Sequence, residues 1–363
     1  MRRFSDRTSS ACVGWTTTLA AVALLSACTS KADPGRSTGT GSGPSPTDVS
    51  VSPNPAADRR ECDYGSADVR TGVFRETRRE EVTTYQDWLG CRVDYVVDFP
   101  ARRTWDQLAQ IDYLLQEWCG MDRRLVLSLG LLPEDEPADF ATGATGAYDD
   151  RFTAVGEALV AAGREDTIIR LGWEFNLLES RWYTPDADAF IAYWRRVVDT
   201  LRAVPGQRFE FTWNLGRSGV DAVPYYPGDE YVDQIGVDVY DATGADGTYP
   251  YPDDCDEECR RERQDTAWEE EILGGERGLE FWADFARDRG KPLALPEWGL
   301  WDRPDAASGD ANSSFIRRMY DFMSDPENNV AYQAYFEFDG SDGTHRLMTT
   351  FPEQGEIYRD LLR

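Results

Sequence analysis

The amino-acid sequence predicts an α/β fold of the (β/α)8, or TIM, barrel class, and three observations support this prediction. From Gly72 onward, short apolar runs alternate with stretches of helical period. The alternation repeats eight times, and β-strands joined by right-handed helical crossovers form a parallel sheet. No glycine-rich phosphate loop follows the first apolar run, which argues against an open dinucleotide-binding sheet. A closed barrel accounts for all three observations.

The order of the elements follows from the same pattern. Amphipathic stretches predict helices at residues 80–89, 104–118, 149–162, 186–204, 267–289 and 314–324. The connection after the fifth strand, around residues 224–232, is short, and a final helix is expected at residues 356–362. The eight strands are expected to begin near Gly72, Arg92, Leu125, Thr167, Phe209, Gln234, Pro292 and Val330.

The charge and the histidine content of the chain exclude several classes of function. The 363 residues include 38 Lys and Arg against 66 Asp and Glu, which gives a formal net charge of -28. Such a polyanion repels phosphate backbones, so nucleic acid is not an expected partner. The single histidine, His345, excludes multi-histidine metal sites and leaves almost no room for a Ser-His-Asp triad. We therefore expect no metal and no cofactor, and chemistry that depends mainly on carboxylates.

The N-terminal residues predict export. Residues 1–27 begin with basic side chains and continue into a mostly apolar run, which is the layout of a secretory signal peptide. The run ends in Leu-Ser-Ala before Cys28, and this resembles a bacterial lipobox, in which the cysteine becomes the acylated first residue. We expect a lipoprotein anchored through Cys28 to the outer face of the bacterial cell membrane. The alternative is an ordinary signal peptide with an incidental cysteine.

A linker is expected between the leader and the barrel. Residues 28–60 are rich in Ser, Thr, Gly and Pro and contain almost no large apolar side chain. Such a segment cannot bury enough surface to offset its ordering entropy, so it predicts a disordered tether. Residues 61–363 form the expected catalytic domain, which we expect to be monomeric.

Five cysteines follow the lipobox, and an exported chain favours disulfide bonds. Cys91 precedes the second strand and Cys119 ends the helix before the third. Both should therefore lie at the N-terminal face of the barrel, which makes them the preferred pair. Cys255 and Cys259 lie in an acidic loop and could close a small ring, with a metal site as the alternative. Because five is odd, at least one cysteine stays free or pairs outside the chain, and Cys62 has no assigned partner.

Two glutamates end apolar strands, at the place where barrel enzymes carry their active sites. Glu174 ends the fourth strand and Glu297 ends the seventh. With a period of two, Glu174 shares the face of Arg170 and points into the barrel mouth, whereas Trp173 points the other way. In retaining glycoside hydrolysis, one carboxyl group protonates the leaving oxygen and the other attacks the anomeric carbon. Either glutamate alone could be a solvated strand-end charge, but together, with Arg170 and Tyr240 nearby, they favour an active site.

Three motifs in this region resemble those of glycoside hydrolase family 26. They are Arg170-Leu171-Gly172-Trp173-Glu174 on the fourth strand, Asp238-Val239-Tyr240 on the sixth, and Pro296-Glu297-Trp298-Gly299 on the seventh. The resemblance implies a clan A barrel and retaining hydrolysis of β-linked glycans, with Glu174 as acid/base and Glu297 as nucleophile. It also implies that Tyr240 hydrogen-bonds the nucleophile, and that β-1,4-mannan is the commonest substrate.

One position departs from the family pattern. Family mannanases usually place a histidine that contacts the sugar directly before the acid/base, and Trp173 occupies this position here. The replacement bears on the substrate more than on the fold, because other members act on mixed-linkage glucan or β-1,3-xylan.

Side chains near the same strand ends are the candidates for binding sugar. Aromatic rings stack on the flat C–H faces of sugars, and we favour Trp298 and Trp301, which bracket the expected nucleophile, over Trp182, Tyr183 and Trp213. Asn214 and Asp238 end neighbouring strands and could bind hydroxyl groups, although Asp238 could equally hold Arg170. His345 is expected to be a simple loop residue. The candidate set is Arg170, Trp173, Asn214, Asp238, Tyr240, Trp298 and Trp301.

We therefore expect a surface-anchored retaining β-glycanase with a polysaccharide substrate, most similar to an endo-β-1,4-mannanase. One alternative is hydrolysis of another β-glycan, such as mixed-linkage glucan, β-1,3-xylan or an exopolysaccharide. A second is a non-catalytic glycan-binding lipoprotein. A third, a metal-dependent hydrolase, is disfavoured by the single histidine.

Overall fold

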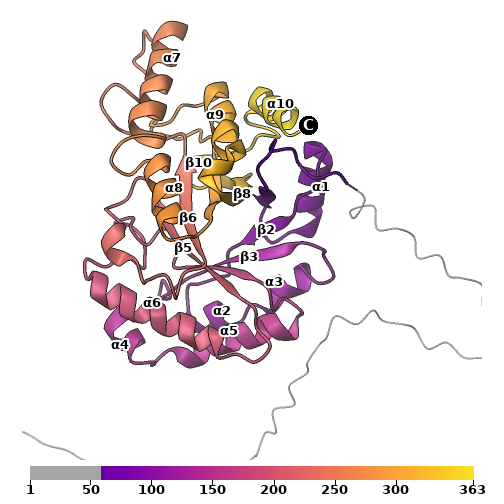
Figure 1. The fold of residues 1–363 in the computed structure, drawn as a ribbon, viewed down its shortest axis with the longest axis vertical. Coiled ribbons are helices and arrows are strands. Elements are labelled where there is room, and N and C mark those ends of the chain that lie inside the picture. Colours follow the sequence, from indigo (N-terminus) through magenta and orange to yellow (C-terminus); the bar gives the residue numbers. More distant parts are fainter. Residues whose placement is uncertain (1–58) are drawn as a thin grey trace, which may run out of the picture.

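The computed structural model describes residues 59–363, which form a closed barrel of eight parallel strands surrounded by helices (Figure 1). The predicted (β/α)8 fold is confirmed, and each strand begins within three residues of its expected position. The strands are β1 (Arg70–Phe74), β2 (Tyr95–Asp98), β3 (Arg124–Leu129), β4 (Ile168–Leu171), β5 (Glu210–Gly216), β6 (Gln234–Tyr240), β7 (Leu293–Gly299) and β8 (Val330–Phe336).

Side chains fill the inside of the barrel. Strands that follow one another in sequence pair in parallel, and β1 closes the barrel by pairing with β8. Phe74, Val126, Ile168 and Tyr332 belong to one buried cluster contributed by separate strands. A second, larger core lies between the sheet and the helices. Because the interior is packed, a substrate can reach only the ends of the strands.

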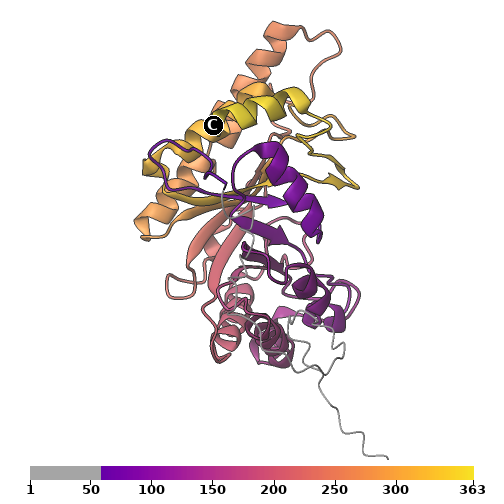
Figure 2. The same cartoon turned by 90° about the vertical axis from the view of Figure 1, so that its right-hand side faces the viewer.

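The helices lie around the outside of the barrel in both views (Figures 1 and 2). Each long helix presents an apolar face to the sheet; in α6, for example, Phe190, Trp194, Val197 and Leu201 recur at helical spacing and are buried. The helices are α1 (Arg79–Leu89), α2 (Trp105–Ala109), α3 (Asp112–Glu117), α4 (Phe140–Ala144), α5 (Asp149–Ala161), α6 (Ala187–Arg202), α7 (Glu257–Thr266), α8 (Leu279–Asp288), α9 (Ser313–Ser324) and α10 (Pro352–Leu361). Shorter elements are the π-helix Ala267–Ile272, the 3-10 turns Val223–Tyr225 and Pro326–Asn328, and the hairpin of β9 (Asp339–Gly340) and β10 (Gly343–Thr344).

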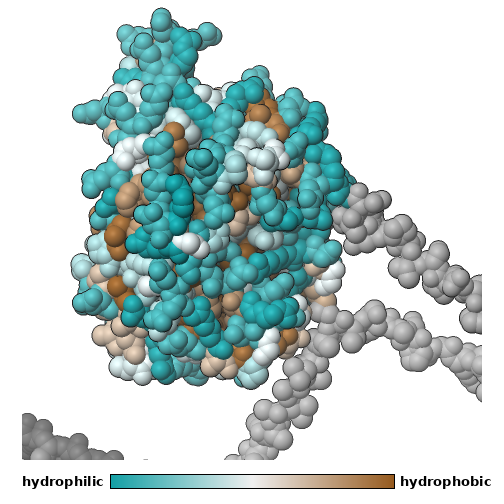
Figure 3. Space-filling model, in the orientation of Figure 1, coloured by the Kyte–Doolittle hydropathy of each residue, from teal (hydrophilic) through white to brown (hydrophobic). Residues whose placement is uncertain are grey.

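Four helical segments differ from the prediction, and one of them is the short helix α4, which was not predicted. The stretch 104–118 divides into α2 and α3, and the stretch 267–289 is interrupted between the π-helix and α8. Gly275 has a φ of +75°, which favours glycine, and a Cβ at Gly274 would lie 2.2 Å from the carbonyl oxygen of Glu269. Helix α7 was not predicted because it buries no residue and so has no apolar period. It projects from the barrel, and its surface is hydrophilic (Figures 1 and 3).

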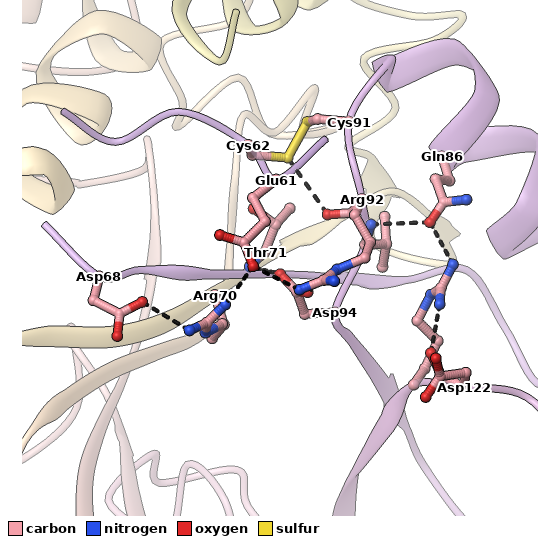
Figure 4. A network of polar contacts seen from close by, with 12 residues as sticks. Glu61, Cys62, Asp68, Arg70, Thr71, Gln86, Cys91, Arg92, Asp94 and Asp122 are labelled. Carbon is pink, nitrogen blue, oxygen red and sulfur yellow. Dashed lines mark hydrogen bonds and ion pairs between the residues drawn. A yellow bond between two sulfur atoms is a disulfide. The ribbon is translucent and has the colours of Figure 1, made fainter. Parts of the chain in front are cut away.

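The segment before β1 is fixed to the N-terminal face of the barrel by a disulfide bond between Cys62 and Cys91 (Figure 4). The predicted pair of Cys91 with Cys119 is therefore wrong. The physical reason is the path of this segment: the Arg92 amide donates to the Arg60 carbonyl at 2.8 Å, which brings Cys62 beside the residue that precedes β2. An ion pair between Arg92 and Glu61, at 2.9 Å, holds the same two segments together.

The second predicted disulfide is present. Cys255 and Cys259 are bonded, with their Cα atoms 5.3 Å apart. Cys259 lies in the first turn of α7 rather than in a loop, and its amide donates to the capping side chain of Asp256 at 3.0 Å.

The predictions for the N-terminal region lie outside the described residues. They comprise the signal peptide, Cys28 and most of the linker. Within residues 59–363, no helix combines the length and hydrophobicity needed to cross a bilayer.

Candidate active site

A cleft of about 1010 Å³ opens at the carboxyl ends of the strands. Segments that follow every strand from β2 to β8 contribute to its wall, which includes both predicted catalytic glutamates, Glu174 and Glu297. This is the face on which barrel enzymes act. The cleft is large enough for several sugar rings, because pockets for drug-sized ligands span roughly 300–1,000 Å³.

The backbone after β4 turns sharply to expose Glu174. Strand β4 ends at Leu171, and Gly172 and Glu174 then adopt left-handed φ values of 58° and 52°. A left-handed glutamate is strained and persists only where its surroundings fix it. Here the Glu174 amide donates to the Asn214 carbonyl at 3.0 Å, and Asn176 exchanges hydrogen bonds with Gly216 of β5.

This turn overturns the predicted orientation of Trp173. Strand alternation would place Trp173 opposite Glu174, but the pleat is lost at Gly172 and both side chains line the cleft. The Trp173 ring packs against Trp182, with centroids 4.5 Å apart, and the Arg102 guanidinium lies 5.2 Å from its centroid. The Trp182 indole N–H donates to the Trp173 carbonyl. Trp173 therefore forms a fixed aromatic wall beside the acid/base candidate.

Glu297 projects from β7 into a set of hydrogen-bond donors. The Tyr240 hydroxyl donates to its Oε1 at 2.6 Å, so the contact implied by the family resemblance is present. Both terminal nitrogens of Arg170 lie 3.4 Å from Oε2. Donors of this kind stabilise a charged carboxylate and fix its orientation.

Arg170 holds the floor of the site rather than lining the cleft. Its side chain is fully buried, and it donates to Asp238 at 2.5 Å, to Asn214 at 2.9 Å and to Ser128 at 2.9 Å. Asn214 is equally buried and is absent from the cleft wall. The structure therefore places Arg170 and Asn214 beneath the cleft as positioning groups. Asp238 reaches the wall but is bound to Arg170, which is the alternative considered for it.

Glu174 and Glu297 have different electrostatic surroundings. Burial raises the pKa of Glu174 well above its ordinary value, and the charges of Asp238 and Glu297 raise it further. No described residue donates a hydrogen bond to its carboxyl group. Burial and the Glu297 carboxylate also raise the pKa of Tyr240, so this phenol stays a donor. The Glu174 carboxyl group is thus set up to hold a proton, whereas the Glu297 carboxyl group accepts hydrogen bonds from Tyr240 and Arg170.

Two of the predicted sugar platforms are core residues instead. Trp298 follows Glu297 on β7, so it points outward, where it is fully buried and donates to Gln333. Trp213 is also fully buried, packed on Phe175 and residues of α8. Trp301 and Trp182 do line the cleft, and Tyr183 does not.

Sequence reasoning missed the aromatic groups that the end of β8 and the segment after it contribute to the cleft wall. Phe336 ends β8, and His345 follows the β9–β10 hairpin; both line the cleft. The His345 ring lies 4.8 Å from Tyr240, between centroids, although the two residues are far apart in sequence. The only sequence signal was that His345 is the single histidine.

The cleft continues over the loops after β5 and β6. A neighbouring depression of about 470 Å³ shares Arg217, Ser218, Thr243 and Gly244 with it and extends to Arg277. The two together form an open groove rather than a closed pocket.

Comparisons with known proteins agree with this architecture. The family model described as glycosyl hydrolase family 26 matches residues 181–252, a segment that includes Tyr240. The resemblance to this family is therefore confirmed. No curated protein sequence matches the chain.

Solved structures share the fold. A double mutant of the endo-β-1,4-mannanase from Cellulomonas fimi aligns with a TM-score of 0.53 at 16% identity, over 80% of this chain and 70% of that one. GH26C from a Muricauda species aligns with a TM-score of 0.54 at 13% identity, over 82% of this chain and 86% of that one. The catalytic domain of a Bacillus GH26 endo-β-1,4-mannanase aligns with a TM-score of 0.51 at 17% identity, over 80% of this chain and 86% of that one. At such identities the likeness establishes the fold, and with the family match it supports a glycoside hydrolase of β-linked glycans.

Proposed function

The chain resembles glycoside hydrolase family 26, and we propose that it is a retaining glycoside hydrolase with Glu174 as the acid/base and Glu297 as the nucleophile. The observation that carries the proposal is the contrast between the two carboxyl groups. Burial and neighbouring carboxylates raise the pKa of Glu174, whereas Glu297 accepts hydrogen bonds from Tyr240 and Arg170. Two carboxyl groups held in such different surroundings are a usual sign of an acid and its partner base or nucleophile.

The chemistry follows in two steps. Protonated Glu174 gives its proton to the glycosidic oxygen while Glu297 attacks the anomeric carbon, which forms a glycosyl-enzyme ester and releases the leaving sugar. Glu174, now charged, then removes a proton from water, which displaces Glu297 and restores both groups. The Tyr240 hydroxyl orients Glu297 before attack.

The substrate we propose is a β-linked polysaccharide cleaved at internal bonds. The extent of the cleft and its neighbouring depression supports internal cleavage, since together they offer room for several sugar units beside the glutamates. The mannanases among the structural relatives make β-1,4-mannan the first polymer to test. Trp173 in place of the family histidine favours including other β-glycans.

We also propose that the protein acts from the outer face of the cell membrane as a monomeric lipoprotein anchored through Cys28. The lipobox-like sequence before Cys28 supports this proposal. Incorporation of labelled palmitate into the wild-type chain, and its loss in Cys28→Ala, is the expected result.

The hydrolase proposal is tested with the soluble chain, residues 29–363. Reducing ends are measured on β-mannan, galactomannan, glucomannan, mixed-linkage glucan and β-1,3-xylan, and the anomer of the first product is read by proton NMR. We expect hydrolysis with retention, lost in Glu297→Ala and kept in Glu353→Ala, a control on the exposed start of α10. Glu174→Ala should recover activity on aryl glycosides with good leaving groups, which need no protonation.

Other outcomes have defined meanings. Inverted product would contradict the assignment of Glu297 as nucleophile. Binding of a glycan by the folded protein without any hydrolysis would favour the non-catalytic alternative.

A further inference from the structure

The single histidine is built rigidly into the cleft wall. His345 is only 2% exposed, and its amide donates to the Phe338 carbonyl at 3.0 Å. The Tyr335 hydroxyl donates to the His345 carbonyl at 2.8 Å, and the preceding residue, Thr344, pairs with Asp302 through two backbone hydrogen bonds. The backbone of His345 is therefore fixed, and its buried ring has little room to turn.

The hydrogen bonds determine which ring nitrogen carries the proton. Nδ1 lies 2.8 Å from the Leu300 carbonyl oxygen, which can only accept, so Nδ1 bears the hydrogen. Burial lowers the pKa of His345 to about 4, against the opposing effect of the Leu300 carbonyl and of Asp342 and Asp339. The ring is therefore neutral, and Nε2 is an acceptor without a hydrogen.

Nε2 has no partner of its own in the described part of the chain. The neighbouring donors are already used: the Tyr240 hydroxyl binds Glu297, and the Trp301 indole N–H binds the Asp342 carbonyl at 3.1 Å. Nε2 is also not among the fully buried polar atoms that lack a partner, so it remains reachable from the cleft that His345 lines.

The position of this acceptor relates it to the reacting sugar. The His345 ring centroid lies 4.8 Å from that of Tyr240, whose hydroxyl is 2.6 Å from Glu297. Trp301 and Phe336 flank the imidazole, each with its centroid 5.1 Å away. A sugar ring against Glu297 would face two aromatic surfaces and one neutral acceptor.

We propose that Nε2 of His345 accepts a hydrogen bond from a hydroxyl group of the sugar bound against Glu297, and so determines which glycan is accepted. The proposal rests on the proposed hydrolase function. A site that hydrogen-bonds a substrate hydroxyl discriminates against sugars that lack it or present it in the other configuration, because the buried acceptor is then left unpaired.

A pair of substitutions separates this role from a packing role. His345→Gln places an amide oxygen near the position of Nε2 but removes the ring, whereas His345→Phe keeps the ring and removes the acceptor. We expect kcat/KM to fall about tenfold in His345→Phe, the effect of losing one neutral hydrogen bond to the substrate, and to fall less in His345→Gln. Both variants also lose the Nδ1 hydrogen bond to the Leu300 carbonyl, so the comparison between them isolates the acceptor. The reverse order, with Phe more active than Gln, would show that the ring only packs and would overturn the proposal.

A spectroscopic measurement tests the acceptor directly. Because the chain has one histidine, 15N-histidine labelling gives one pair of ring resonances. The expected spectrum has a protonated Nδ1 and a bare Nε2 at pH 6. In Glu297→Ala protein, adding the glycan that the wild-type protein cleaves should shift Nε2, and adding a glycan that it does not cleave should not.

The outcomes distinguish the two proposals. If a glycan is cleaved but Nε2 carries the hydrogen or does not respond to it, the His345 proposal alone fails. If no glycan of the panel is bound or cleaved, the hydrolase proposal fails and the His345 proposal fails with it.

Discussion

Replacing Arg170 tests whether a buried charge network stabilises the fold beneath Glu297, the proposed nucleophile. Arg170 and Asp238 are fully buried and 2.5 Å apart. At an effective dielectric of about 20, the gross attraction at this distance is roughly 7 kcal/mol, most of which offsets the desolvation of the two charges. Arg170→Met leaves Asp238 unpaired, and we expect the free energy of unfolding to fall by about 3–5 kcal/mol.

Substitution of Asp238, alone and together with Arg170, tests whether the two charges stabilise each other. Asp238→Asn alone should cost about 2–3 kcal/mol, because it removes the charge-assisted hydrogen bond and leaves Arg170 without a full counter-charge. The double variant removes both charges, so it should be at least about 2 kcal/mol more stable than the sum of the single losses predicts. Urea unfolding at constant m-value measures all four proteins.

A surface pair provides the control for this cycle. Arg124 and Glu210 lie 2.7 Å apart but are partly exposed, and Arg124→Met should cost less than about 1 kcal/mol through loss of the ion pair. Additive losses for Arg170 and Asp238, within about 0.5 kcal/mol, would refute the charge network.

Three further predictions concern single contacts. Tyr240→Phe removes the 2.6 Å hydrogen bond to Glu297 and should lower kcat/KM about 10- to 100-fold, measured on the preferred glycan; an unchanged value would contradict a role in orienting Glu297. Glu174 has a folded pKa above its ordinary 4.5, so its burial costs stability as pH rises past 4.5. The Tm of Glu174→Gln minus that of the wild type should therefore increase between pH 4 and 7, and a flat difference would argue against the raised pKa. The double variant Cys62→Ala/Cys91→Ala opens a loop with a sequence separation of 29, and its free energy of unfolding, measured in urea, should be about 3.6 kcal/mol lower than that of the wild type. An unfolding midpoint equal to that of the wild type would show that the disulfide does not stabilise the fold.

The sequence predicted the fold because the strands of a barrel are buried on both faces and read as apolar runs. It predicted Glu297 for the same reason, since a charged residue ending such a run is conspicuous. The alternation of side chains along a strand also predicts the orientation of Trp298, because a residue next to an inward-pointing glutamate must point outward. The choice of Trp298 as a sugar platform did not take this into account.

Other features could not be predicted from local sequence. The left-handed turn at Gly172 and Glu174 is fixed by contacts with β5, which lie about 40 residues away. His345 acquires its neighbours from β6, from Leu300 after β7 and from β8, and no spacing along the chain predicts this. Helix α7 buries no side chain, so its sequence carries no apolar period. In each case the determining interactions are tertiary.

The segment that enters the barrel and the cleft lie at opposite ends of the strands, and this affects how the proposed polysaccharide substrate can approach. Residues 60–63 are held at the N-terminal face, where Arg60 meets Arg92 and Asp63 meets Leu362, and the cleft opens at the other end of the strands. The point at which the chain joins the barrel therefore lies on the face opposite the cleft. For the lipid-anchored hydrolase proposed above, this arrangement would let a polymer approach the cleft from the face opposite the attachment point.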